Sequence, residues 1–130
     1  RLGRDLPAGP VMAECDAELL QIVLVNLLGN AVKYGNVDGL VRLRLRRLPD
    51  ALAVSVWNEG PGFPDSERGR LFKKFSRLQT RDLLSRKGSG VGLYTSWRIV
   101  RLHGGHIEAH SQPGAWAEFS VTIPQPLPKA

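Results

Sequence analysis

Cysteine is nearly absent from this chain of 130 residues, where Cys15 is the only one. One cysteine cannot form an intrachain disulfide, so a disulfide-stapled secreted fold is excluded and a reducing compartment is favoured. The sequence also lacks an apolar run near the roughly 20 residues that cross a bilayer, and residues 1–5 do not have the pattern of a signal peptide. We therefore expect a cytoplasmic location, while membrane anchoring of a longer protein stays open.

Acidic residues are scarce as well, because 12 Asp+Glu stand against 18 Lys+Arg and give a net charge of +6. This excess favours acidic partners, namely phosphates, nucleic acid or anionic lipid, without choosing among them. The hydrophobic fraction of 42% is typical of a globular chain and argues against wholesale disorder. The length fits one domain with a substantial core.

The spacing of apolar residues predicts the order of helices and strands. Residues 1–10 show no periodicity and form a predicted entry segment, and residues 124–130 contain three prolines and form a predicted frayed tail. Between them we predict a strand at 11–15, a helix at 17–34, a hairpin of strands 40–48 and 51–57, a loop at 58–64, a short helix at 65–75, a long loop at 76–90, a helix at 91–103, and a hairpin of strands 106–111 and 118–123.

Two residues are predicted to cap the helix at 17–34. Asp16 is expected to be its N-cap, and Gly35 is expected to end it in a left-handed conformation. The order of elements predicts an α+β fold, a two-layer α/β sandwich in which about three helices cover one face of a mixed, largely antiparallel sheet.

Three segments carry polar or glycine residues where chemistry could take place. Asn26, Asn30, Lys33 and Tyr34 fall on one stripe of an otherwise apolar helix, so they either face a wet cavity or lie solvated near the helix end. Residues 58–62, Asn-Glu-Gly-Pro-Gly, follow a strand and allow a sharp turn, although most such loops are only turns. Residues 88–92, Gly-Ser-Gly-Val-Gly, open a helix whose free amides favour an anion, in a pattern that matches neither a Walker loop nor the dinucleotide fingerprint.

The order of these segments resembles the ATP-binding catalytic domain of sensor histidine kinases, within the GHKL ATPase superfamily. Residues 26–34 resemble the N box, 58–64 the G1 box, 71–75 the F box, and 88–93, followed by His-Gly-Gly at 103–105, the G2 box. The resemblance covers nearly the whole chain. It implies one domain at 1–130 with the Bergerat (GHKL ATPase) fold and an ATP lid at 76–89.

The resemblance also implies ATP and Mg²⁺ as cofactors and a role for individual residues. Asn30 is similar to the Mg²⁺ ligand, and Lys33 would pair with phosphate. The resemblance places Asn26 among the catalytic residues together with Lys33. Asn26 stands where gyrase-like relatives carry a general-base glutamate, so an amide here favours a kinase over a hydrolase. The implied nucleotide-binding residues are Asn30, Lys33, Tyr34, Asn58, Gly60, Gly62, Phe63, Arg77, Lys87, Gly88, Gly90, Val91, Gly92 and Leu93.

The implied reaction transfers the γ-phosphoryl group of ATP to a histidine on a separate dimerisation helix, and then to an aspartate of a response regulator. That helix is not expected among these residues. The implied partners are the histidine-bearing dimerisation domain, the receiver domain of the response regulator, and a second copy in a full-length homodimer. We expect the isolated chain to bind ATP weakly and barely to hydrolyse it.

Two of the motifs depart from the family pattern. Asn58 replaces an aspartate that would accept the adenine amino proton, and an amide oxygen accepts that bond without charge. Trp116 and Ala117 replace the glycine and threonine of the last box. The resulting hypothesis is weaker nucleotide binding, through crowding by Trp116 or through the missing hydroxyl group at Ala117.

Other interpretations stay open. The chain could be another GHKL protein, such as an anti-sigma serine kinase or an ATPase, or a degenerate nucleotide-binding or scaffold module. Nucleic-acid binding by the arginines of strand 40–48 is disfavoured, because no interleaved aromatic residues support base stacking. A zinc site at His106, Glu108 and His110 is disfavoured too, because no fourth ligand has a suitable spacing.

Overall fold

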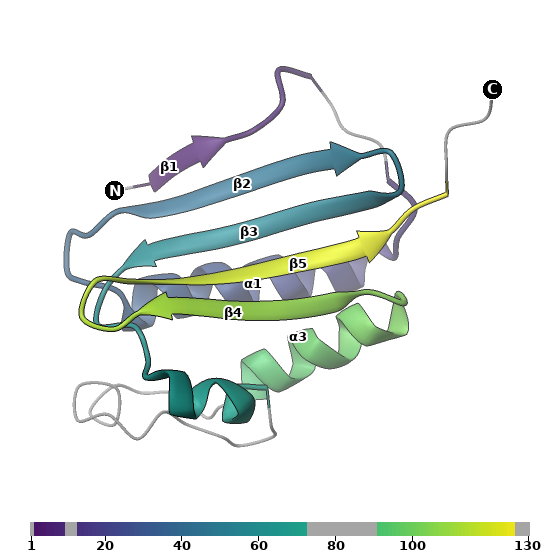
Figure 1. Ribbon diagram of the computed structural model, residues 1–130. Helices are drawn as coiled ribbons and strands as arrows, with labels where there is room; N and C mark the ends of the chain where they lie inside the picture. The colour runs from purple at the N-terminus through teal and green to yellow at the C-terminus, as the bar shows by residue number, and fades with distance from the viewer. Residues whose placement is uncertain (1, 10–12, 73–90, 127–130) are drawn as a thin grey trace.

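A computed structural model describes residues 2–9, 13–72 and 91–126 (Figure 1). The elements, in chain order, are β1 (Leu2–Asp5), α1 (Ala17–Tyr34), β2 (Val41–Leu48), β3 (Ala51–Glu59), the 3₁₀ helix η1 (Asp65–Arg70), α3 (Val91–Leu102), β4 (His106–Gln112) and β5 (Trp116–Pro124). The five strands form one sheet in the order β1-β2-β3-β5-β4. Only β1 and β2 are parallel, so the sheet is mixed and largely antiparallel.

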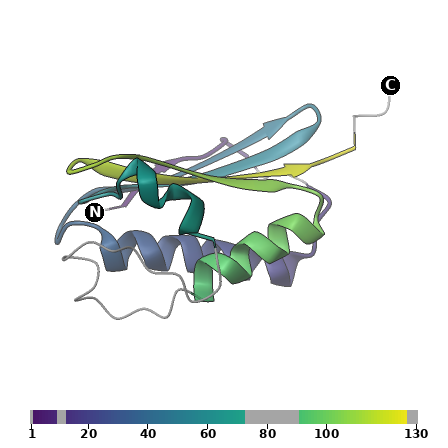
Figure 2. The same ribbon diagram turned by 60° about the horizontal axis from the view of Figure 1, so that its bottom comes forward.

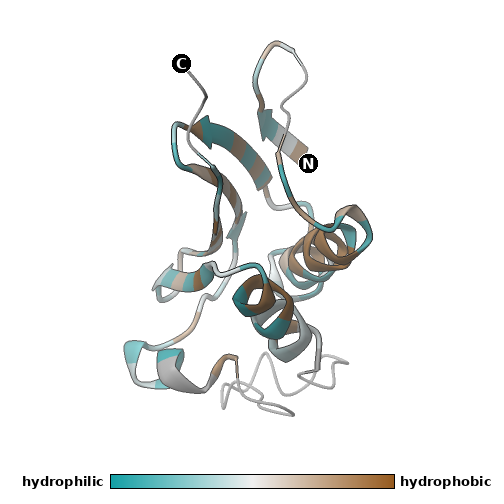
Figure 3. Cartoon of the chain, turned by 90° about the vertical axis from the view of Figure 1, so that its right-hand side faces the viewer, coloured by the Kyte–Doolittle hydropathy of each residue, from teal (hydrophilic) through white to brown (hydrophobic). Residues whose placement is uncertain are grey.

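The helices α1 and α3 cover one face of the sheet, and the opposite face carries no helix in the described part of the chain (Figure 2). This arrangement confirms the predicted two-layer α+β fold, whose layers are seen end-on in Figure 3. Side chains alternate along β3 and β5 because successive residues of a strand point to opposite faces, and one set is buried under the helices. The core joins Val23, Leu27 and Ala31 of α1 to apolar residues of the sheet and α3, among them Val56, Ile99, Val100, Phe119, Val121 and Ile123.

The two ends of α1 are formed differently from each other. The Asp16 carboxylate accepts a hydrogen bond from the Leu19 N–H at 3.0 Å, which confirms the predicted N-cap. The left-handed cap predicted at Gly35 is wrong, because this residue is extended, with φ −83° and ψ 174°. A Cβ at this position would lie 2.5 Å from the Ala31 carbonyl oxygen and 3.1 Å from that of Glu59. The absence of a side chain at Gly35 therefore allows the end of α1 to lie close to the end of β3.

Several predicted segments differ from the structure near the ends of the chain. The predicted entry segment contains β1, which pairs with β2 and is tied to it by the Arg44–Asp5 salt bridge at 2.9 Å. The strand predicted at 11–15 is wrong for residues 13–15, and 11–12 lie outside the described residues. The predicted frayed tail is wrong at Gln125, which is 6% exposed and pairs with the backbone of Glu14.

Other corrections concern the middle of the chain. The short helix predicted at 65–75 is a 3₁₀ helix at Asp65–Arg70, residues 71–72 form a turn, and 73–75 lie outside the described residues. β3 extends to Glu59 and β5 starts at Trp116, so residues assigned to loops by the sequence belong to the sheet. Asn58 therefore occupies a strand position with a fixed facing direction. The other predicted elements that fall within the described residues occur in the predicted order.

Candidate functional site

The polar stripe of α1 faces the beginning of α3. The Asn26 amide group donates hydrogen bonds to the Gly92 carbonyl oxygen at 3.2 Å and to the Ser96 hydroxyl at 3.3 Å. Ser96 is fully buried, so these bonds lie between the two helices. Ser96 was not predicted from the sequence, although a polar residue on an apolar helix face is a usable signal. The predicted N box and the end of the predicted G2 box are therefore in direct contact.

The stripe continues along α1 toward the end of β3. Asn30 is half-buried one turn after Asn26, and its side chain makes no hydrogen bond within the described ranges. Lys33 is exposed and Tyr34 is half-buried at the last turn. A half-buried amide oxygen without a partner suits a hard cation such as Mg²⁺. The arrangement at Asn30 thus fits the ion that the resemblance implies.

Asn58 supplies a second polar atom suited to a ligand. It is 5% exposed, and its amide nitrogen donates to the Glu59 carbonyl oxygen at 3.2 Å. Its Oδ1 atom accepts no hydrogen bond within residues 2–9, 13–72 and 91–126. A buried acceptor left in this state is unfavourable by about 1–3 kcal/mol. A ligand N–H, such as that of an adenine amino group, would satisfy it.

The glycines after β3 are required by packing within the chain. A Cβ on Gly60 would lie 3.0 Å from the Asn58 amide nitrogen and 3.0 Å from the Tyr34 carbonyl oxygen. Gly62 has a φ of +64°, and a Cβ there would collide with the Ser111 hydroxyl oxygen. Approach of an adenine ring to these glycines stays a prediction.

Phe63 lies deeper than the predicted nucleotide contact suggests. Its side chain is 2% exposed and packs on Phe119 with ring centroids 6.3 Å apart. Its backbone N–H donates to the Ser111 hydroxyl at 2.9 Å. The ring of Phe63 therefore supports the loop from the core side.

The first turn of α3 forms the other wall of the candidate site. Backbone N–H groups at a helix start have no intrahelical acceptor and favour an anion. Gly92 is different from Gly60 and Gly62, because a Cβ there would meet Asn26 only at an ordinary 3.5 Å. Leu93 packs against the core. Val91 begins α3, whereas Arg77, Lys87, Gly88 and Gly90 lie outside the described residues.

The two departures in the last box face opposite sides of the sheet. Trp116 pairs with Glu59 and packs on Trp57 at 6.4 Å, on the face away from the helices. Crowding of the nucleotide by the Trp116 side chain is therefore not supported. Ala117 is buried and lies in register with Asn58, so both side chains point to the helix face. The position at which the family pattern has a threonine hydroxyl is therefore next to the Asn58 Oδ1 atom, which accepts no hydrogen bond within the described residues.

The described residues give little support to a metal site on β4 or to nucleic-acid binding by the arginines of β2. On β4, Glu108 lies 3.9 Å from His106 and 3.4 Å from His110, yet no group of three His, Cys, Asp or Glu that could hold a metal occurs among the described residues. Arg44 is paired with Asp5 rather than free for a nucleic-acid phosphate. Within the described chain, no helix has the length and apolarity needed to cross a membrane.

Comparison with known proteins decides the family. A family described as histidine kinase-, DNA gyrase B- and HSP90-like ATPase matches residues 15–127. The chain belongs to this ATPase family. Among curated relatives, the circadian input-output histidine kinase CikA of Synechococcus elongatus is 41% identical over 110 residues, which are 85% of this chain and 15% of CikA. The adaptive-response sensory kinase SasA of Parasynechococcus marenigrum is 41% identical over 122 residues, 92% of this chain and 31% of SasA.

Solved structures of the ATPase family share the fold. The mycobacterial sensor histidine kinase MprB is 26% identical with a TM-score of 0.79, over 97% of this chain and 85% of that one. Full-length ShkA in complex with AMPPNP is 27% identical with a TM-score of 0.81, over 99% of this chain and 26% of ShkA. The chain thus spans a small part of CikA, SasA and ShkA but most of the MprB structure.

Proposed function

We propose that residues 1–130 are the ATP-binding catalytic domain of a two-component sensor histidine kinase. The observation that carries the proposal is the contact of Asn26 with the first turn of α3, because it sets the polar stripe of α1 beside a helix start that favours phosphate. The names of CikA and SasA as kinases, and the AMPPNP complex of ShkA, support the same function.

In this proposal the nucleotide lies between α1, the end of β3 and the start of α3. The Asn58 oxygen accepts the adenine amino proton, and Tyr34 packs near the base or ribose. The amides of Gly88, Gly90 and Gly92 bind the phosphates, and Lys33 pairs with them. The proposed nucleotide-binding set also includes the loop residues Gly60, Gly62 and Phe63, Arg77 and Lys87 of the lid at 76–89, and Val91 and Leu93.

Asn30 is the residue of this chain that would hold Mg²⁺ through its amide oxygen. Held there, Mg²⁺ would supply positive charge that offsets the negative charge of the phosphates. The half-buried Asn30 side chain has no competing partner in the described part of the chain, so no bond within those residues must break for this role.

The reaction is a group transfer in which this domain supplies position and charge. A ring nitrogen of the acceptor histidine forms a bond to Pγ, the bond from Pγ to the bridging oxygen of ADP breaks, and ADP leaves with that oxygen and its electron pair. Asn26 cannot act as a base, because its amide takes up no proton and its nitrogen already donates to Gly92 and Ser96. A water molecule is therefore not activated at this position, which favours transfer over hydrolysis.

The proposal extends to the complete protein. Its partners are a histidine-bearing dimerisation domain and the receiver domain of a response regulator, its full-length form is a homodimer, and its location is cytoplasmic. Nucleic acid is not a partner in this proposal.

A phosphotransfer assay tests the proposal. The chain is incubated with γ-labelled ATP, Mg²⁺ and a separately purified histidine-bearing dimerisation domain, and in parallel with a serine protein substrate. We expect an acid-labile, alkali-stable phosphoryl linkage on the dimerisation domain, which identifies phosphohistidine. Label only on the serine protein would favour the anti-sigma kinase interpretation, and fast release of phosphate without an acceptor would favour an ATPase.

A further inference from the structure

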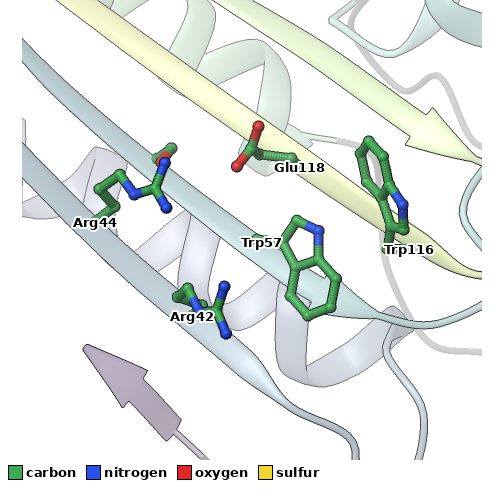
Figure 4. A pocket seen from close by; sticks show the side chains of 6 residues that line it. Arg42, Arg44, Trp57, Trp116 and Glu118 are labelled. Atoms are coloured by element: carbon green, nitrogen blue, oxygen red, sulfur yellow. The ribbon is translucent and has the colours of Figure 1, made fainter. Parts of the chain in front are cut away.

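The sheet face opposite the helices carries a pocket with its own chemistry. On this face, a shallow pocket of about 270 Å³ is lined by Arg42, Arg44, Ser55, Trp57, Trp116 and Glu118 (Figure 4). These side chains come from the neighbouring strands β2, β3 and β5, and the helices lie behind those strands. The pocket is therefore separated by the sheet from the candidate nucleotide site.

Aromatic residues are concentrated there. Two of the three tryptophans of the chain, Trp57 and Trp116, lie in this pocket with ring centroids 6.4 Å apart and planes tilted by 32°. The Arg42 guanidinium group lies 5.7 Å from the Trp57 ring centroid and holds that ring by a cation–π contact. The outer face of an antiparallel sheet normally carries polar side chains, whereas tryptophan and arginine are the residues that dominate binding energy at protein interfaces.

The charges of the pocket are incompletely paired. Arg44 binds Asp5 of β1 at 2.9 Å. Within the described residues, Arg42 has no carboxylate partner, and the Glu118 carboxylate makes no hydrogen bond or ion pair. The pocket thus offers a cation, an aromatic surface and an acceptor within one small area.

The volume indicates the size of what fits. Pockets for small molecules usually measure about 300–1,000 Å³, so about 270 Å³ suits one anchoring side chain better than a whole cofactor. Anchor side chains of interfaces are mostly aromatic. An aromatic anchor that carries a donor, as tyrosine does, can stack on Trp116 and donate to Glu118.

We propose that this pocket receives a tyrosine from an acidic segment of a partner protein. The tyrosine ring packs on Trp116 and its hydroxyl donates to the Glu118 carboxylate, while carboxylates that flank the tyrosine pair with Arg42 and with Arg46, which shares the outer face of β2. The net charge of +6 favours an acidic partner over long range. The surface is independent of the nucleotide site, so this inference does not depend on the proposed function.

The test is a titration of the isotope-labelled chain with a short peptide, followed by nuclear magnetic resonance. The probe is an acetylated, amidated peptide with one tyrosine between two Asp-Glu pairs, and the control peptides replace the tyrosine by alanine or the acidic residues by lysines. We expect shifts at the indole N–H of Trp57 and Trp116 and at the Ser55 and Glu118 amides with the first peptide only. Arg42→Gln should weaken its binding roughly fivefold or more, as loss of an interface anchor does.

Two controls separate binding from folding. Arg101→Gln makes the same change of charge on the helix layer and should leave peptide affinity unchanged, and the melting temperature of each variant verifies its fold. Equal binding of the lysine peptide, or of the alanine peptide, would overturn the proposal. Saturation of the same indole signals by anionic lipid vesicles or by oligonucleotide, without any effect of the acidic peptide, would overturn it in favour of those ligands.

Discussion

Replacement of Gly62 by alanine should destabilise the domain more than replacement of any other left-handed glycine that the structure describes. Gly62 has a φ of +64° in the loop between β3 and η1. A Cβ there collides with the Ser111 hydroxyl and lies 2.8 Å from the Trp116 carbonyl oxygen. The substitution thus combines backbone strain with displacement of a bonded side chain.

The magnitude follows from two contributions. A left-handed conformation of a residue with a Cβ is unfavourable by about 1–2 kcal/mol. The displaced Ser111 hydroxyl accepts from the Phe63 N–H at 2.9 Å and donates to the Trp116 carbonyl at 3.0 Å, and each such bond contributes about 0.5–1.5 kcal/mol. We expect Gly62→Ala to lower the free energy of unfolding by about 2–5 kcal/mol.

Urea unfolding followed by tryptophan fluorescence measures this change, with Gly114→Ala as the matched control. Gly114 has a φ of +82°, but a Cβ at this position would have no atom within 4 Å beyond the neighbouring residues of the chain, so only the strain of about 1–2 kcal/mol applies. In a Ser111→Ala background the effect of Gly62→Ala should shrink, because the collision partner is gone. Equal losses for Gly62→Ala and Gly114→Ala would refute the reasoning.

Three further changes test other contacts. His103→Ala removes the ring nitrogen that accepts the Asp16 N–H at 2.9 Å and should lower the free energy of unfolding by about 0.5–1.5 kcal/mol. His106→Ala, at an exposed position of β4, should not alter the urea midpoint. Asn26→Leu should lower the hydrogen-exchange protection of the first turn of α3, because both bonds from α1 are lost; unchanged protection would contradict that link. Asn58→Asp should lower the melting temperature, because a carboxylate cannot donate the hydrogen bond that the Asn58 amide gives to the Glu59 carbonyl oxygen at 3.2 Å. The same variant should bind ATP more tightly in calorimetry, because its acceptor is charged. Weaker ATP binding would contradict the proposed contact of residue 58 with adenine.

The sequence predicted best the elements that local patterns determine. The α1 boundaries at Ala17 and Tyr34 followed from the Asp16 cap and an unbroken apolar run, and β2 followed from strict alternation. β1 could not be predicted, because four residues carry too little periodicity and their parallel partner lies far along the chain. The extended Gly35 likewise depends on the approach of β3 to α1, which is a tertiary contact.

In the candidate site, too, the sequence identified the segments but not every side-chain direction. The segments containing Asn26 and Gly92 were recognised from the sequence, and the structure brings these two residues together. The side to which Trp116 points was missed, because this residue was assigned to a loop motif. Alternation from the buried Phe119 would have placed Trp116 on the outer face, had β5 been extended to its true start.

Calorimetric titration of ATP into the chain, with and without Mg²⁺, tests the central claim most directly. We predict binding that strengthens with Mg²⁺, loses its Mg²⁺ dependence in Asn30→Ala, and is unchanged in Asn36→Ala, an exposed asparagine beyond the end of α1. Absence of Mg²⁺-dependent ATP binding by the unaltered chain would contradict the assignment of this site as a catalytic nucleotide site.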